Sequence, residues 1–159
     1  MTIKDLFRRW GLTRISLNTK FASAEFSPID DDRTAAWDMY VELLTRISTQ
    51  PLQLESGDEK RALDSIYSLW GITREILKQK GRTAEQFSRI AIIVLNQVIR
   101  PFTAKWHKLS LENAFDNPEM CQVFRKDLQD TQESLNAYTR LLADMAQVED
   151  LTAINYLDE

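Results

Sequence analysis

The sequence predicts an all-α fold: a four-helix up-down bundle, preceded by a short amphipathic helix and an extended, strand-like arm. Apolar residues recur at helical spacing over four long stretches, capping patterns and prolines mark where these stretches begin and end, and glycine occurs only 4 times in 159 residues. A composition of 43% hydrophobic and 28% charged residues is typical of one globular domain. We expect one domain over 1–159, with the helix and arm at 1–27, the bundle at 28–148 and an acidic tail at 149–159.

The N-terminal segment predicts a short amphipathic helix that ends at Gly11. Its apolar side chains fall at i, i+3, i+4 and i+7, and therefore on one face: Ile3, Leu6, Phe7 and Trp10. In the 13–27 segment, every second residue from 15 to 21 suits the buried side of a strand: Ile15, Leu17, Thr19 and Phe21. An arm packed on helices is the alternative, because no partner strand is evident nearby.

Two helices are predicted before residue 82. The acidic triplet 30–32 precedes an apolar-periodic run and favours a helix N-terminus over a cation site, so we expect a helix from about 31 to 48 that ends before Pro51. Ser56 and Glu59 have capping-box spacing and predict the start of a second helix, closed by Gly81. Its register places apolar residues on one face: Leu63, Ile66, Tyr67, Trp70, Ile76 and Leu77.

Two more helices are predicted after residue 82. Thr83 and Gln86 repeat the capping-box spacing and predict a helix that Pro101 kinks or interrupts. Asn117 as cap and Pro118 at the first helical position predict the last helix. Its buried seam has heptad spacing: Phe124, Leu128, Thr131, Leu135, Tyr138, Leu142 and Met145.

Charge and residue counts exclude several function classes. A net charge of −4 argues against recruitment of any nucleic acid by bulk electrostatics, and we expect no DNA partner. One cysteine and one histidine leave no zinc cluster, and no glycine-rich phosphate loop is present, so we expect neither a metal nor a cofactor. The longest apolar run, residues 90–95, is far shorter than the roughly 20 residues of a membrane span. With no secretory signal evident and Cys121 expected to be a small buried side chain, the sequence predicts a cytoplasmic location.

The third predicted helix contains one constellation that can carry chemistry. At about 100° per residue, its polar residues fall in one narrow stripe: Asn96, Arg100, Thr103 and His107. An arginine can stabilise an anionic phosphorane-like transition state, and a histidine can move a proton to or from a ribose oxygen. The simpler interpretation is the solvated face of an amphipathic helix.

Arg100 and His107, with six residues between them, resemble the arginine–histidine motif of HEPN ribonucleases. That resemblance implies a small helical bundle, usually dimeric, in which two motifs form a metal-independent active site acting on RNA. The chain departs from the pattern at Pro101, where that family commonly has a polar residue.

Three longer stretches resemble uncharacterised small helical bacterial proteins, some of them encoded near defence genes: AAWDMYVELLTRISTQPL, ALDSIYSLWGITREIL and VLNQVIRPFTAKWH. This resemblance implies a bacterial protein and supplies no chemistry. The leading hypothesis is a non-enzymatic interaction or sensor module that binds a protein partner, a second copy of itself or a small ligand. The HEPN-like ribonuclease, using Arg100, His107 and Asn96 on RNA, is the alternative.

The N-terminal helix is the candidate partner-binding element of this module. Its apolar face, formed by Ile3, Leu6, Phe7 and Trp10, can dock into a partner groove or lie on anionic lipid. Packing of the same face against the chain's own bundle is the simpler interpretation.

Overall fold

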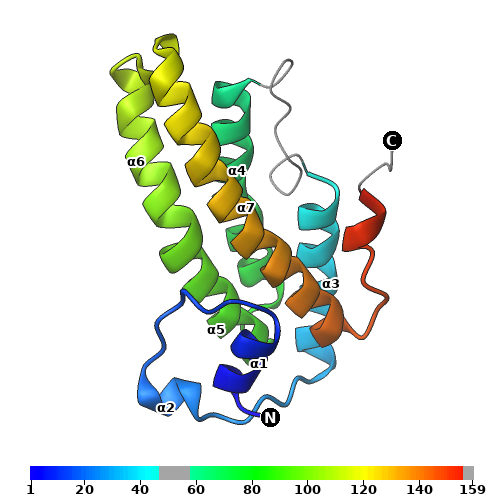
Figure 1. The fold of residues 1–159 in the computed structure, drawn as a ribbon. Coiled ribbons are helices and arrows are strands. Elements are labelled where there is room, and N and C mark those ends of the chain that lie inside the picture. Colours follow the sequence, from blue (N-terminus) through cyan, green and yellow to red (C-terminus); the bar gives the residue numbers. More distant parts are fainter. Residues whose placement is uncertain (47–57, 156–159) are drawn as a thin grey trace.

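The computed structural model describes residues 1–46 and 58–155 and consists of helices joined by short connections (Figure 1). The helices are α1 (Ile3–Arg9), α2 (Thr19–Ala22), α3 (Asp30–Leu44), α4 (Glu59–Lys80), α5 (Glu85–Val94), the π-helical segment η2 (Leu95–Ile99), α6 (Arg100–Leu111) and α7 (Pro118–Ala146). Two short 3₁₀ turns are η3 (Ala114–Asp116) and η4 (Thr152–Asn155). No strand occurs in the described residues, where the only strand-like pairing is an isolated bridge between Thr2 and Glu25. The all-α class is confirmed.

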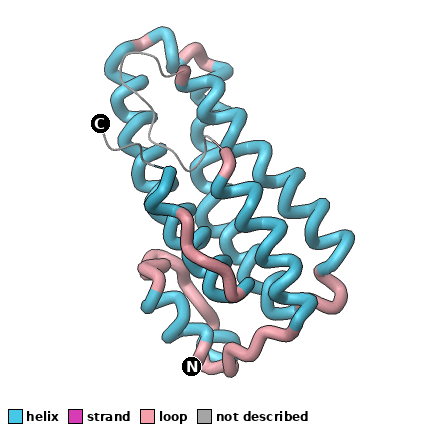
Figure 2. Tube along the Cα trace, turned by 90° about the vertical axis from the view of Figure 1, so that its right-hand side faces the viewer, coloured by secondary structure: helices cyan, strands magenta, loops and turns pink. Residues whose placement is uncertain are grey.

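The long helices pack side by side around one hydrophobic core. Helix α7 lies mainly against α3, while α4 contacts both α3 and α6 (Figures 1 and 2). The heptad prediction for α7 is confirmed, with Thr131 half-buried and the other six residues of its seam buried: Phe124, Leu128, Leu135, Tyr138, Leu142 and Met145. The simple four-helix arrangement is not confirmed, because the short helix α2 also precedes α3 and the third predicted helix consists of three consecutive segments, α5, η2 and α6.

The third predicted helix continues through Pro101 by way of a π-helical turn. Proline has no backbone N–H, so it cannot donate the usual helical hydrogen bond. The preceding residue, Arg100, donates its N–H to the carbonyl of Leu95, five residues back. The chain therefore accommodates the proline inside a continuous helical rod instead of ending it.

The strand predicted in the 13–27 segment is wrong. Residues 19–22 form a single helical turn because the Asn18 side chain accepts a hydrogen bond from Phe21 N–H at 2.8 Å. The alternative of an arm packed on helices is confirmed, since three of the predicted strand residues pack partly buried against the core: Ile15, Leu17 and Phe21.

Two glutamine side chains hold this arm on the α5–α6 rod. The Gln97 amide accepts from Ser16 N–H and donates to Ser16 O, both at 2.8 Å. Gln86 makes the same pair of bonds with Ser27, at 2.9 and 2.8 Å. The arm is therefore fixed at two points by side chains that imitate a backbone pairing.

The predicted helix starts have different outcomes. The Asn117 cap is confirmed, as its side chain accepts from Glu119 N–H. The capping box at Thr83 is wrong: α5 has Ala84 as its N-cap with no side-chain cap, and Gln86 is engaged with the arm. Helix α4 has Asp58 as its cap, and the predicted Ser56 cap lies outside the described residues.

The helix boundaries before residue 82 also differ in part from prediction. Helix α3 ends at Leu44, and the predicted end before Pro51 lies outside the described residues. Gly81 closes α4 as predicted.

The capping role of the acidic triplet is confirmed at Asp32, which is only 2% exposed. One carboxylate oxygen accepts from Ile29 N–H at the start of α3, and the other accepts from Phe87 N–H in the first turn of α5, both at 3.0 Å. A single carboxylate thus satisfies backbone donors at two helix N-termini, where negative charge is favourable.

Candidate functional site

The predicted polar stripe lies on the outer side of the α5–α6 rod. Asn96 and Arg100 are exposed, and Arg100 donates from Nε and Nη2 to Asn96 Oδ1 at 3.3 and 3.1 Å. Thr103 is buried instead, and its hydroxyl donates to Ile99 O at 3.0 Å. Arg100 is therefore hydrogen-bonded to Asn96, which lies one turn earlier, and its guanidinium points towards the N-terminal end of the rod.

Helix α4 presents a matching series of side chains opposite this stripe. The Tyr67 and His107 rings have centroids 4.6 Å apart, and Trp70 donates from Nε1 to Thr103 Oγ1 at 3.4 Å. One turn beyond Trp70, Arg74 of α4 and Arg100 of α6 both place their guanidinium groups near this indole. These cross-helix pairs run in opposite directions along the two chains, as antiparallel neighbouring helices require.

Trp70 is the centre of a cationic cluster. The Arg100 guanidinium carbon lies 4.7 Å from the centroid of the indole, and that of Arg74 lies 5.5 Å from it. These distances fall within the range of cation–π attraction. In the described parts of the chain, neither guanidinium has a carboxylate within ion-pairing distance.

These side chains line an open hollow of about 250 Å³. Its described lining residues carry basic, aromatic and hydroxyl groups and no carboxylate: Tyr67, Trp70, Arg74, Arg100, Thr103, Ala104 and His107. Along α4, the seven residues from Tyr67 to Arg74 correspond to about 10 Å. The hollow therefore has an aromatic end at Tyr67 and His107 and a cationic end at Arg74 and Arg100.

Sequence reasoning did not assign the α4 half of this hollow. Tyr67 was expected in the helix's apolar core register, but its side chain is 49% exposed. Trp70 and Arg74 follow it at i+3 and i+7, the spacing of one helical face, and that spacing was the available signal. The pairing of this α4 face with α6 depends on how two helices that are far apart in the sequence align in space.

Arg100 and His107 of one chain are not in contact. Seven helical steps of about 1.5 Å place their Cα atoms about 10 Å apart along the axis, and Arg100 is hydrogen-bonded to Asn96 on the side away from His107. The two side chains line the same hollow at its opposite ends.

The predicted partner-binding residues of the N-terminal helix face the chain's own core. Ile3, Leu6 and Phe7 are buried there, and Trp10 is partly buried against the same cluster. The apolar face of α1 is therefore covered by the bundle it belongs to.

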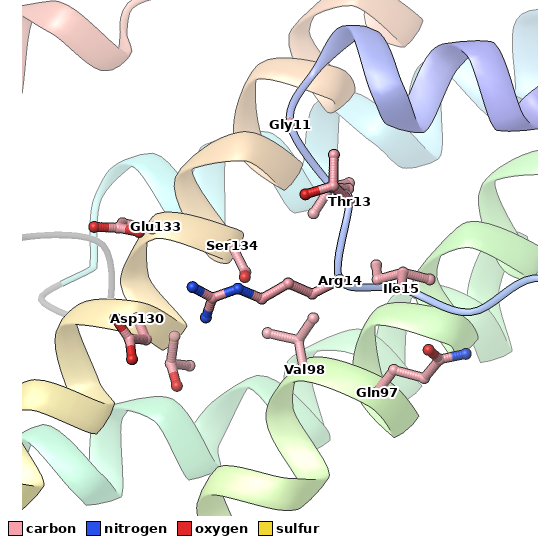
Figure 3. Close-up of a pocket in the computed structure, with 11 residues that line it drawn as sticks. Gly11, Thr13, Arg14, Ile15, Gln97, Val98, Asp130, Glu133 and Ser134 are labelled. Carbon is pink, nitrogen blue, oxygen red and sulfur yellow. The ribbon is translucent and has the colours of Figure 1, made fainter.

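A second hollow, of about 320 Å³, lies where the arm crosses η2 and α7 (Figure 3). Arg14 extends from the arm towards Asp130 and Ser134 of α7, with Glu133 on the same helix. The hydrogen bond from Lys126 lowers the pKa of Asp130, and the charge of Arg14 acts in the same direction. Opposite charges compensate one another here, in contrast to the cationic hollow.

Other chemistry has little support in the described residues. Over 1–46 and 58–155, no group of three or more His, Cys, Asp or Glu side chains is arranged to hold a metal ion. Burial raises the pKa of the Cys121 thiol, and Glu59 adds to the effect, which disfavours the nucleophilic thiolate. Within the same ranges, no helix has the length and apolar character needed to cross a bilayer.

Comparison with known proteins yields no match to a family model, to a curated protein or to a solved structure. The geometry of the α4–α6 hollow is accordingly the basis for the function proposed below.

Proposed function

We propose that this protein is a non-enzymatic helical binding or sensor module that recognises a nucleotide unit in the hollow between α4 and α6. The observation that carries the proposal is the pair of arginines around Trp70, both without a carboxylate partner in the described residues. Arginine is well suited to phosphate because its planar guanidinium donates two parallel hydrogen bonds.

The phosphate would lie at the cationic end of the hollow. Arg74 comes from α4 and Arg100 from the start of α6, so the two guanidinium groups approach the site from opposite walls. Their stacking on Trp70 limits the conformations that must be lost on binding. An anion between them would relieve the repulsion of two neighbouring positive charges.

The base would lie at the aromatic end. Tyr67 is half exposed and its ring is held against His107, so one wall of the site is an ordered aromatic surface. Stacking of a base on such a ring contributes about 1–3 kcal/mol. The offset of about 10 Å between Tyr67 and Arg74 along α4 matches the extent of a nucleotide, from base to phosphate.

The test is fluorescence anisotropy with a dye-labelled single-stranded RNA pool at low salt in EDTA. We expect the wild type to bind, and Arg74→Gln with Arg100→Gln to weaken binding by about tenfold or more. Tyr67→Ala should weaken it by a similar factor. The matched control is Arg89→Gln, which removes the same charge from an exposed α5 arginine paired with Glu85. Absence of wild-type binding, or an equal loss in the control, contradicts the proposal.

A HEPN-like ribonuclease is the second candidate function. The arrangement that favours it is an arginine hydrogen-bonded to Asn96 and a histidine lining the same hollow. In a dimer, Arg100 of one copy would stabilise the charged phosphorane while His107 of the other transfers a proton from the ribose 2′-hydroxyl. EDTA-resistant cleavage of RNA by the wild type, lost in both Arg100→Ala and His107→Ala, would establish this activity in place of simple binding.

The biological setting is a proposal of the same kind. The resemblance to small bacterial proteins encoded near defence genes supports a bacterial cytoplasmic role as part of a defence system. A binding module of this kind would transmit ligand occupancy to a protein partner or to a second copy.

A further inference from the structure

A second surface, on the opposite side of α4, has the properties of a helix-docking groove. It is an open groove of about 600 Å³ between α3 and α4. Trp37 and Val41 of α3 line it and are 45% and 37% exposed, and Ile72 and Ile76 line it from α4. Ile76 is buried and Ile72 half-buried, so Trp37 and Val41 are the large apolar side chains left in contact with water here. Neighbouring exposed apolar side chains of this kind are typical of an interaction site.

Gly71 lies on the α4 side of this groove, inside a 22-residue helix. Glycine is the least favourable residue in a helix interior apart from proline. A Cβ built on Gly71 meets no atom within 4 Å, so no close packing within the described residues requires glycine there. The missing side chain leaves the α4 backbone open to close approach from outside.

The charge of the groove restricts what can occupy it. Among the described residues that line it, all the ionisable ones are acidic: Asp38, Glu42 and Glu75. Asp38 forms an ion pair with Lys80, and Glu42 forms one with Arg46. Among the described residues, Glu75 accepts a hydrogen bond only from the uncharged side-chain amide of Gln79. An anionic lipid surface or the same face of a second copy would place like charges against Glu75.

We propose that this groove binds an amphipathic helix of a partner protein. The apolar stripe of that helix would cover Trp37 and Val41, its backbone would approach α4 at Gly71, and a lysine or arginine beside the stripe would pair with Glu75. This goes beyond the proposed nucleotide site, because the groove uses a different face of α4 and none of the residues that line the hollow.

The probe is a dye-labelled synthetic helical peptide with leucine on one face and lysine on the other. Its binding to the full chain is measured by fluorescence anisotropy of the dye. Gly71→Leu places a branched side chain in the groove at a position where its Cβ meets no atom within 4 Å, and it should weaken peptide binding at least about tenfold. Trp37→Ala should weaken it as well. The matched control is Ile92→Ala, which removes an exposed apolar side chain from α5.

Several results would overturn the docking proposal. One is equal affinity of Gly71→Leu and the wild type. Another is equal binding of a peptide in which glutamate replaces lysine. A third is a wild-type dimer, seen by sedimentation, that Gly71→Leu dissociates, since the groove would then hold a second copy. Gly71→Leu should retain the RNA binding tested above, so failure of one proposal is distinguishable from failure of the other.

Discussion

Two charged regions of this molecule differ in how the chain treats its charges. At the junction of α3 and α5, Asp32 is buried and each of its carboxylate oxygens accepts a backbone N–H. In the α4–α6 hollow, Arg74 and Arg100 are exposed and both lie close to the Trp70 indole, with no carboxylate lining the hollow in the described residues. A charge that the fold satisfies internally supports the fold, whereas a charge held in place but unpaired is available to a ligand.

The largest expected effect comes from removing the satisfied charge. Asp32→Ala leaves two backbone donors unpaired at helix N-termini, and we expect a loss of about 2–4 kcal/mol in the free energy of unfolding. Urea denaturation followed by circular dichroism measures it. Asp31→Ala is the matched control, because Asp31 is exposed in the same turn and should change stability by less than about 0.5 kcal/mol. Equal losses in the two variants would contradict the structural role of Asp32.

The second prediction extends the comparison to uncharged polar groups. Gln97→Ala removes both hydrogen bonds to Ser16, and we expect a loss of about 1–2 kcal/mol and a looser arm. Trypsin should then cut faster after the exposed Arg14. The control is Gln79→Ala, since Gln79 donates its hydrogen bond to Glu75 within its own helix. Unchanged proteolysis of Gln97→Ala would mean that other contacts hold the arm.

Helix α7 and the Gln86 contact with the arm show which features the sequence could predict and which it could not. Local signals were sufficient for α7, where Asn117, Pro118 and a heptad seam define a helix that the structure contains. They were insufficient for Gln86, whose spacing from Thr83 suggested a local cap while its amide binds the distant Ser27. A residue's tertiary partner depends on the packing of segments far apart in the chain, which a local pattern does not encode.

The candidate site divides in the same way. Helical periodicity placed Arg100 and Asn96 on one face, and they are hydrogen-bonded. It also placed Thr103 in that stripe, but the residue is buried against α4, where it accepts from Trp70. The contribution of Arg74 was not predictable, because the alignment of α4 with α6 follows from core packing.

The third prediction uses two tyrosines that test the limit of the comparison. The Tyr40 hydroxyl donates to Glu149 O and accepts from Leu151 N–H, so it fastens the segment after α7 to α3. The Tyr138 hydroxyl is buried and finds no partner among the described residues, and burial raises its pKa far above the usual value. Tyr40→Phe should lose about 1 kcal/mol, whereas Tyr138→Phe should be neutral or slightly stabilising.

Thermal and urea unfolding of the two phenylalanine variants measure this difference. A clear loss of stability in Tyr138→Phe would show that its hydroxyl is satisfied in solution. Tyr138 would then be a further polar group that is satisfied within the fold and stabilises it. Equal stability of Tyr40→Phe and the wild type would mean that the segment after α7 is held by its other contacts.

The smallest effect on stability is expected at the unpaired charge. Arg100→Gln loses two exposed hydrogen bonds to Asn96 and a cation–π contact worth about 0.5–1 kcal/mol, but it also reduces repulsion from Arg74. We therefore expect the free energy of unfolding to change by less than about 1 kcal/mol. The same variant should weaken RNA binding when measured beside its unfolding curve. A loss as large as that of Asp32→Ala would instead make Arg100 a structural residue, and the distinction between the two regions would fail.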